Sequence, residues 1–194
     1  MSDVPEKIYI SSDQLLRDSF ELGLKVVESG FHPDFIVAIW RGGTPVGIAV
    51  QELLSYAGIH TDHIAIRTSY YEGIGEVANS VQVHNLGYLV ENLNYDNSLL
   101  LVDDVFDKGR SIEAILKELR RQCRRNMPAN IKIATTWYKP EKNMTAIAPD
   151  FYVHETNGWL VFPHELDGLP REELREHKPF VEDILVKVDE HRAE

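Results

Sequence analysis

Two nearly continuous apolar runs dominate the hydrophobic pattern of this chain. They cover residues 35–40 and 98–102, and each is followed by a polar stretch with glycine and then by apolar residues at helical spacing. Such runs are typical of strands that are buried on both faces, as in a parallel sheet. Weaker patterns predict two more strands at residues 62–68 and 131–137 and an opening helix near residues 12–29. Strands that alternate with helices predict an open α/β sheet.

Local signals place several boundaries between these elements. Thr44 and Pro45 suit the N-cap and the first position of the helix after the first apolar run. The helix after the second run is expected to begin at about Ser111. Ser11 with Gln14 matches a weak capping box at the start of the opening helix.

Two stretches fall outside the regular alternation of strands and helices. Residues 70–85 are polar and contain Gly73 and Gly75, which predicts a mobile loop. Residues 169–194 are dense in charge with spaced apolar side chains, which predicts an acidic helical tail at the surface or at a subunit contact. No repeat or linker divides the chain, so we expect a single domain over residues 1–194.

Composition and charge narrow the classes of function. With 43% hydrophobic and 26% charged residues, the chain has the balance of a soluble globular protein, and no apolar run reaches the roughly 18–20 residues of a membrane helix. The net charge of −11 argues against a general binder of nucleic acids or anionic membranes. The single cysteine and a start without the layout of a signal peptide predict a reducing, cytoplasmic location.

That cysteine, Cys123, lies within a cluster of arginines on a predicted helix. The arginines are Arg120, Arg121, Arg124 and Arg125. Their positive charge would lower the pKa of the thiol and make it reactive. The alternative is a solvated basic face beside an inert thiol, and such a face would also suit an acidic patch on another subunit.

The stretch after the second apolar run carries the chemistry. Asp103 and Asp104 follow the predicted strand directly, and Asp107, Gly109 and Ser111 precede the next helix. Adjacent carboxylates can accept hydrogen bonds from sugar hydroxyls or hold Mg²⁺. Glycine lets a ligand approach the backbone closely, and the unpaired N–H groups of a helix N-terminus bind phosphate. These residues predict a site for a phosphorylated, hydroxylated ligand.

Residues 99–111, Leu-Leu-Leu-Val-Asp-Asp-Val-Phe-Asp-Lys-Gly-Arg-Ser, resemble the 5-phosphoribosyl-1-pyrophosphate (PRPP) motif of type I phosphoribosyltransferases. The resemblance implies that Asp103 and Asp104 contact the ribose hydroxyls, one of them through a metal ion. It implies that Asp107 also handles a proton near N7 of a purine base. The loop that wraps the 5′-phosphate would consist of Asp107, Lys108, Gly109, Arg110 and Ser111. Lys108 stands where the family usually has a small hydroxyl residue.

Four further segments are similar to this family, in the same order along the chain. Arg41, Gly42 and Gly43 resemble the pyrophosphate loop, in which the arginine and the glycine amides receive the diphosphate that leaves. Ser69 and Tyr70 resemble the start of the mobile hood that closes over the reacting centre.

The other two segments resemble the base-binding part of purine enzymes. Lys139 is followed by proline, as in the element whose ammonium donates to O6 of a 6-oxopurine. In Gly-Trp-Leu-Val-Phe-Pro, Trp159 would stack on the purine, and Leu160 would offer backbone contacts. Glu165 would help to hold a second metal ion together with pyrophosphate.

The resemblance also implies a fold, substrates and a cofactor. It implies an open, mainly parallel twisted sheet flanked by helices, with a small hood from the N-terminal segment and residues 150–168. It implies a purine salvage enzyme with PRPP and a purine base as substrates and Mg²⁺ as cofactor, in a homodimer or homotetramer. Val161 replaces an acid that contacts the 2-position of the base in the xanthine-guanine branch, so hypoxanthine is favoured over xanthine and guanine.

Two alternatives stay open at this point. A regulatory protein of the same fold would sense PRPP or a nucleotide without catalysis. A transferase with the same PRPP site would use an acceptor other than a purine.

Overall fold

The computed structural model describes residues 7–71 and 80–192. The chain divides into two compact units, residues 15–157 and residues 1–14 together with 158–194. The larger unit contains a six-stranded sheet in the order β4-β3-β2-β5-β6-β7. Its strands are β2 (Phe35–Trp40), β3 (Asp62–Tyr71), β4 (Ser80–His84), β5 (Ser98–Phe106), β6 (Asn130–Tyr138) and β7 (Phe151–Glu155). Every neighbouring pair is parallel except β3 and β4, which confirms the expected open, mainly parallel α/β sheet.

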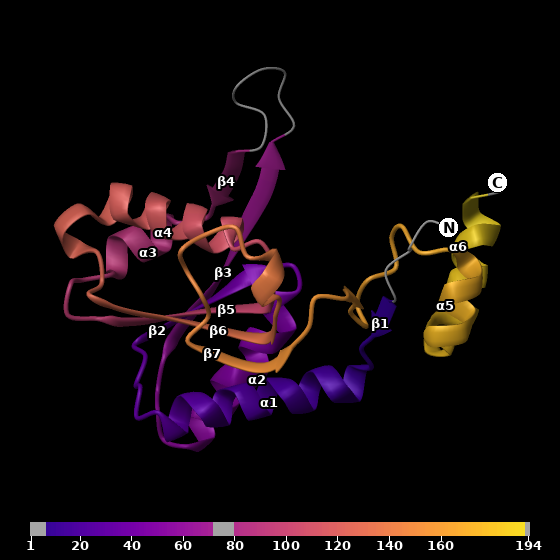
Figure 1. Cartoon of the computed structure of the whole chain (residues 1–194), viewed down its shortest axis with the longest axis horizontal. Coiled ribbons are helices and arrows are strands. Elements are labelled where there is room, and N and C mark those ends of the chain that lie inside the picture. The colour runs from indigo at the N-terminus through magenta and orange to yellow at the C-terminus, as the bar shows by residue number, and fades with distance from the viewer. Residues whose placement is uncertain (1–6, 72–79, 193–194) are drawn as a thin grey trace. The chain divides into compact units, whose positions relative to one another are not determined.

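Helices cover both faces of this sheet (Figure 1). One side carries α1 (Ser12–Glu28) and α2 (Gly43–Tyr56), and the other carries α3 (Gly87–Asn92) and α4 (Arg110–Cys123). Short 3-10 turns, η1 (Arg124–Asn126) and η2 (Pro140–Lys142), follow α4 and β6.

The two apolar runs form β2 and the first part of β5, at the centre of the sheet. Val37 and Leu101 belong to a buried cluster with Leu89 of α3 and Ile115 of α4. Because alternate strand residues point to opposite faces, the neighbouring Ala38 faces α2 instead, where only a glycine at position 47 leaves room for its side chain. Burial on both faces, which the continuous apolar pattern predicts, is therefore what the structure shows.

Several boundaries differ from those expected. β5 continues through Phe106 because its backbone still pairs with β6 beyond the apolar run, so Asp103 and Asp104 lie within the strand and not in a loop after it. α2 begins at Gly43 instead of near Thr44 and Pro45, and α4 begins one residue before Ser111. The cap at Ser11 is confirmed, since its Oγ accepts a hydrogen bond of 3.1 Å from the amide of Gln14.

The expected loop over residues 70–85 is wrong for the part that the structure describes. β3 extends to Tyr71, and Ser80–His84 forms β4, which pairs with β3 in antiparallel register. Polar side chains suit an edge strand because one of its sides faces water. Residues 72–79, which include Gly73 and Gly75, lie outside the described residues.

The smaller unit is built on a two-stranded parallel sheet. β1 (Lys7–Tyr9) pairs with β8 (Trp159–Val161), followed by α5 (Arg171–His177), η3 (Pro179–Val181) and α6 (Glu182–Arg192). Its core is formed by Ile10, Leu160, Val161, Phe162 and Leu174. Residues of the charged tail are thus helical, as expected, and α6 has no buried side chain.

Among the described helices of both units, none combines the length and the apolar character needed to cross a membrane.

Candidate active site

A cavity of about 200 Å³ lies where β5 turns into α4, and it is lined by residues 103–112. The turn depends on Gly109, which has a φ of +75°, a conformation that L side chains rarely adopt. A Cβ there would also lie 2.5 Å from Thr145 Oγ1 and 2.9 Å from the ring of Phe106. The first N–H groups of α4 have no partner within the helix and carry the positive end of its dipole. The cavity is therefore suited to a phosphate group.

The acid pair stands at the strand end of this cavity. Asp103 Oδ1 accepts a hydrogen bond of 3.0 Å from the Asp104 amide, and Asp104 Oδ1 accepts one of 2.8 Å from the Val105 amide. Thr136 Oγ1 donates to the Asp104 carbonyl at 2.6 Å, which ties this part of β5 to β6. Burial, and then the negative charge of Asp104, raise the pKa of Asp103 well above its usual range.

Two carboxylates that repel each other in this way fit a divalent cation. Mg²⁺ commonly takes one or two carboxylates and completes its shell with water and substrate phosphates. Within residues 7–71 and 80–192, no group of three or more His, Cys, Asp or Glu side chains forms a closed metal cage. As a pair of carboxylates, Asp103 and Asp104 have the donor chemistry of a Mg²⁺ site that water or phosphate completes.

The glycine-rich turn after β2 packs directly against the acid pair. The Trp40–Arg41 peptide bond is cis, and Arg41 is exposed at the start of the turn. A Cβ at Gly42 would lie 1.7 Å from Asp104 Oδ2, and one at Gly43 would lie 2.6 Å from the Val102 carbonyl oxygen. The fold thus brings together the two loops that the sequence singled out, and neither glycine leaves room for a side chain.

We expect Gly42→Ala to lower the free energy of unfolding by about 1–3 kcal/mol, the usual cost of forcing a methyl group into a packed site. The Asp104 carboxylate must move to admit the new Cβ. Gly87→Ala is the matched control, because a Cβ at Gly87 has no neighbour within 4 Å and its φ is not positive. Urea unfolding of both variants measures the difference, and equal stabilities would contradict the close contact at Gly42.

Lys139 and Asp107, which lie 32 residues apart, form an ion pair of 3.0 Å between Nζ and Oδ2. The Lys139 side chain is only 12% exposed, whereas that of Asp107 is 42% exposed. The backbone supports the pair, since the Lys139 amide donates to the Phe106 carbonyl at 2.9 Å. An ammonium and a carboxylate, which the resemblance assigns to O6 and N7 on one edge of a purine, therefore meet at the ends of β6 and β5.

The cavity lined by residues 103–112 is stabilised by contacts with a turn at residues 143–145, which the sequence did not predict. The Met144 amide donates to the Lys108 carbonyl at 3.1 Å, and Asn143 Oδ1 accepts from the amide and the hydroxyl of Thr145. The Asn-Met-Thr order carries a recognisable Asx-turn signal, but nothing in it tells which loop the turn supports. The Lys108 side chain itself is exposed, while Arg110 and Ser111 are half-buried.

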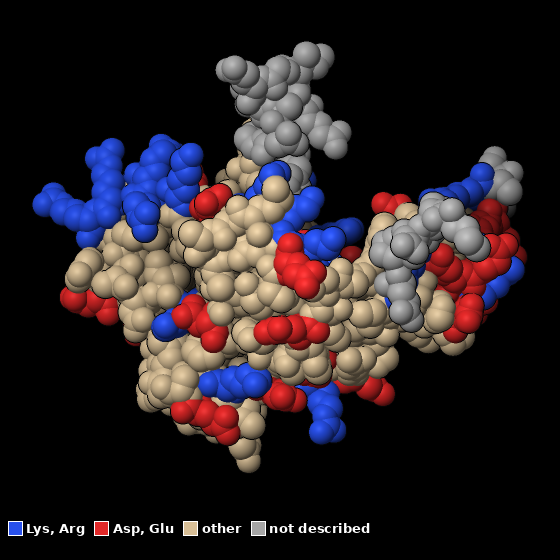
Figure 2. All heavy atoms as spheres, viewed as in Figure 1, with Lys and Arg blue, Asp and Glu red and all other residues tan. Residues whose placement is uncertain are grey.

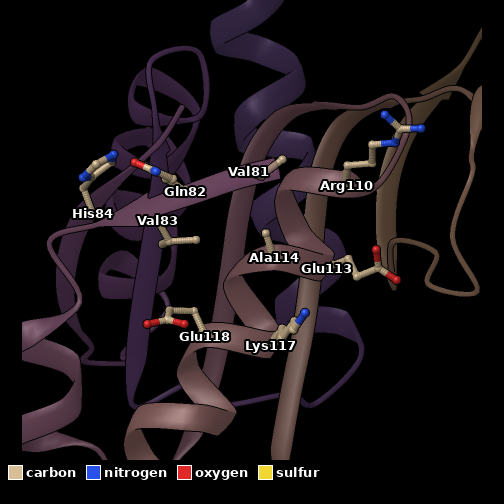
Figure 3. A pocket seen from close by; sticks show the side chains of 9 residues that line it. All are labelled: Val81, Gln82, Val83, His84, Arg110, Glu113, Ala114, Lys117 and Glu118. Carbon is tan, nitrogen blue, oxygen red and sulfur yellow. The ribbon is translucent and has the colours of Figure 1, made fainter. Parts of the chain in front are cut away.

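Ser69 and Tyr70 lie on the β3–β4 hairpin. Ser69 Oγ is 3.0 Å from His84 Nε2, and the backbone of Tyr70 is paired with that of Val81. Between β4 and α4 lies an open groove of about 950 Å³, with Val83 and Ala114 in its middle and charged side chains of α4 along it (Figure 3). Arg110 lines both this groove and the phosphate cavity, so the groove adjoins the site without containing the acid pair.

The remaining candidates belong to the smaller unit. Trp159 is 53% exposed, and Lys7 Nζ lies 5.6 Å from its ring centroid, a cation–π distance. The Leu160 side chain is buried in the core of this unit. One oxygen of Glu165, Oε2, accepts a hydrogen bond of 2.9 Å from the Phe162 amide, so this carboxylate holds a turn together.

The structure decides between the interpretations of Cys123. The thiol is buried, and burial raises its pKa, so the neighbouring arginines do not activate it. Arg120, Arg121, Arg124 and Arg125 are all exposed. Figure 2 shows a concentration of Lys and Arg over the region of α4. The inert thiol beside a solvated basic face is the correct interpretation.

Comparisons with known proteins agree on one family. The sequence profile of the phosphoribosyl transferase domain matches residues 11–167. The hypoxanthine-guanine phosphoribosyltransferase of Lactococcus lactis is 29% identical over 181 residues, which cover 91% of this chain and 89% of that protein.

Solved structures extend the likeness to the fold. A purine phosphoribosyltransferase from Pyrococcus horikoshii is similar with a TM-score of 0.65 and 27% identity, over 85% of this chain and 98% of that one. A hypothetical protein from Neisseria gonorrhoeae, solved with bound ppGpp, has a TM-score of 0.73 at 23% identity, over 91% of this chain and 98% of that one. At this identity, the second likeness concerns the fold alone.

Proposed function

Because the chain belongs to the phosphoribosyl transferase domain family, we propose that it transfers the 5-phosphoribosyl group of PRPP to a 6-oxopurine. The products are a nucleoside 5′-monophosphate and pyrophosphate. The names of the relatives from Lactococcus lactis and Pyrococcus horikoshii support a purine acceptor. The observation that carries the proposal is the Asp107–Lys139 ion pair beside the cavity of about 200 Å³ at the start of α4. It supplies a proton acceptor and a base-recognition donor next to the sugar phosphate.

In this proposal the larger unit holds PRPP. The 5′-phosphate occupies the cavity lined by residues 103–112 and receives hydrogen bonds from the first amides of α4. Asp103 and Asp104 accept hydrogen bonds from the ribose hydroxyls. Arg41 and the amides of the adjoining glycine turn receive the pyrophosphate, since that turn packs against Asp104. Fixed positive groups at the site where charge develops are commonly the largest contribution to catalysis.

Mg²⁺ is the cofactor that this acid pair fits. Bound to Asp103 and Asp104, it would supply positive charge next to the pyrophosphate oxygens. Burial, and then the charge of Asp104, raise the pKa of Asp103, and a cation bound beside this carboxylate would offset both effects.

The reaction exchanges two bonds at C1′ of the ribose. The C1′–O bond breaks, and its electron pair leaves with pyrophosphate, while N9 of the base forms the new bond to C1′. The base loses one proton, and Asp107 takes it. The Asp103–Asp104 pair and Lys139 orient the sugar and the base for this displacement, and such orientation replaces a costly encounter in solution.

Lys139 sets the choice of base. Its ammonium donates a charge-assisted hydrogen bond to a 6-oxo group, whereas the 6-amino group of adenine would bring a second donor against it. A site built to pair one polar group rejects the mismatched analogue by roughly 10⁴-fold. Val161 stands where the resemblance has an acid in the xanthine-guanine branch, and its buried apolar side chain offers no acceptor to a 2-amino group. We therefore place hypoxanthine first among the 6-oxopurines.

An absorbance assay with PRPP and Mg²⁺ tests the proposal. Hypoxanthine, xanthine, guanine and adenine are offered separately, and EDTA is added in a parallel arm. We expect nucleotide formation with 6-oxopurines, fastest with hypoxanthine, and its loss with EDTA. Turnover that EDTA leaves unchanged would remove the metal from the proposal, and a clear preference for guanine would overturn the order of bases. No turnover with any base, despite PRPP binding, would indicate a sensor or another acceptor.

A further inference from the structure

The tail of the chain contains a buried lysine whose role the proposed function does not assign. Lys178 follows α5, beyond residues 11–167 that match the family profile, and it is only 3% exposed. Its amide donates to the Leu174 carbonyl at 2.9 Å, which closes the end of α5. Its ammonium donates a hydrogen bond to the carbonyl of Phe162. Burying an ammonium is costly unless its hydrogen bonds are made, so this contact is a specific one.

Both backbone polar groups of Phe162, the amide and the carbonyl, form hydrogen bonds within this unit. Its amide donates to Glu165 Oε2 at 2.9 Å, while its carbonyl accepts from both the Glu165 amide and Lys178 Nζ. Burial lowers the pKa of Lys178, and the negative charge of Glu165 opposes that shift. The turn that these contacts fix comes directly after β8, the strand of Trp159 and Leu160.

Helix α5, which Lys178 follows, contacts β1, the other strand of this two-stranded sheet. Glu173 of α5 forms an ion pair of 2.7 Å with Lys7, and it accepts a hydrogen bond from the Tyr9 hydroxyl. Lys7 is paired with Trp159 in the sheet, and its ammonium lies at a cation–π distance from the indole ring. The tail therefore contacts β1, which pairs with the strand of Trp159, and the turn directly after that strand.

We propose that Lys178 is a positioning residue for the purine base: it fixes the turn after β8 and thereby the base-contacting segment at residues 159–165. This inference rests on the proposed function and on the resemblance, which implies that Trp159 stacks on the purine and that Leu160 offers backbone contacts. Loss of the charged hydrogen bond from Lys178 to the Phe162 carbonyl should release residues 159–165. Because a hydrogen bond from a charged donor is strong, we expect KM for the base to rise roughly 10- to 100-fold. The KM for PRPP stays near that of the wild type, because the residues that the proposed function assigns to PRPP all lie in the larger unit.

Lys178→Met tests the proposal, since methionine keeps most of the apolar stem and removes the donor. Lys178→Gln retains a donor group and serves as the second variant if the first fails to fold. Lys187→Met is the matched control, because Lys187 is exposed on α6 of the same unit. Thermal unfolding first establishes that each full-length variant is folded.

Two readouts decide the outcome. Hydrogen–deuterium exchange in residues 159–165 should accelerate in Lys178→Met and remain unchanged in Lys187→Met. In steady-state assays, the KM for the base should rise while the KM for PRPP does not. Unchanged exchange, or an equal rise in both KM values, would overturn the positioning role. If the wild type turns over no purine, the proposed function fails, whereas the exchange measurement still decides whether Lys178 fixes the turn.

Discussion

We expect Asp107→Asn to lower the turnover number by roughly 10²–10⁴-fold, the range that a positioned proton-transfer group contributes. Asparagine is nearly isosteric and keeps an oxygen that can accept from Lys139, whose Nζ lies 3.0 Å from Asp107 Oδ2. It cannot take the proton that the base must lose. The affinity for PRPP should stay close to that of the wild type, because backbone amides and the acid pair hold the sugar phosphate. Pre-steady-state turnover and PRPP titration measure the two effects separately.

Asp96→Asn is the matched control for this substitution, because Asp96 is an exposed aspartate in the loop before β5. Its turnover should equal that of the wild type. A turnover number for Asp107→Asn within a factor of about three of the wild type would remove the proton-transfer role from Asp107.

The second large effect is expected at Lys139. Lys139→Met should lower kcat/KM for hypoxanthine roughly 10- to 100-fold, the value of one charge-assisted hydrogen bond to the base. The same substitution should leave the low activity with adenine unchanged or higher, because it removes the donor that repels the 6-amino group. Discrimination between hypoxanthine and adenine therefore narrows. Specificity constants for both bases, measured on the same preparation, provide the comparison.

Lys142→Met provides the control, since Lys142 is an exposed lysine in η2, three residues further along the chain. It should leave both specificity constants unchanged. A parallel loss of activity with hypoxanthine and adenine in Lys139→Met would indicate a structural role for Lys139. A double-mutant cycle with Asp107→Asn should show non-additive effects on kcat/KM, because residues in direct contact rarely act independently.

The elements of the larger unit could largely be read from the sequence. Continuous apolar runs at residues 35–40 and 98–102 are typical of strands that are buried on both faces, and the structure places β2 and β5 at the centre of the sheet. The residue types at 103–111 could also be recognised from the sequence, because adjacent acids, a glycine and a helix start form a local pattern. Hydrophobic periodicity and turn chemistry act over a few residues, so they can be recognised in a single sequence.

The edge strand and the end of β5 were harder to predict from the sequence. The polar residues of β4 looked like a loop, because an edge strand needs no apolar run. Asp103 and Asp104 were placed after the strand, because the apolar run stops before them. Their strand conformation comes from pairing with β6, a partner whose place in the sheet the local sequence does not state.

The sequence by itself determined that this chain forms an α/β sheet, and it singled out the turn with acids and a glycine that joins β5 to α4. Only the tertiary structure decided that Asp107 meets Lys139, that Gly42 leaves room for the Asp104 carboxylate, and that Lys178 is buried against the Phe162 carbonyl. Each of these contacts joins segments that are distant in sequence. Their distances depend on strand order and helix packing, which no local pattern of hydrophobic and polar residues encodes.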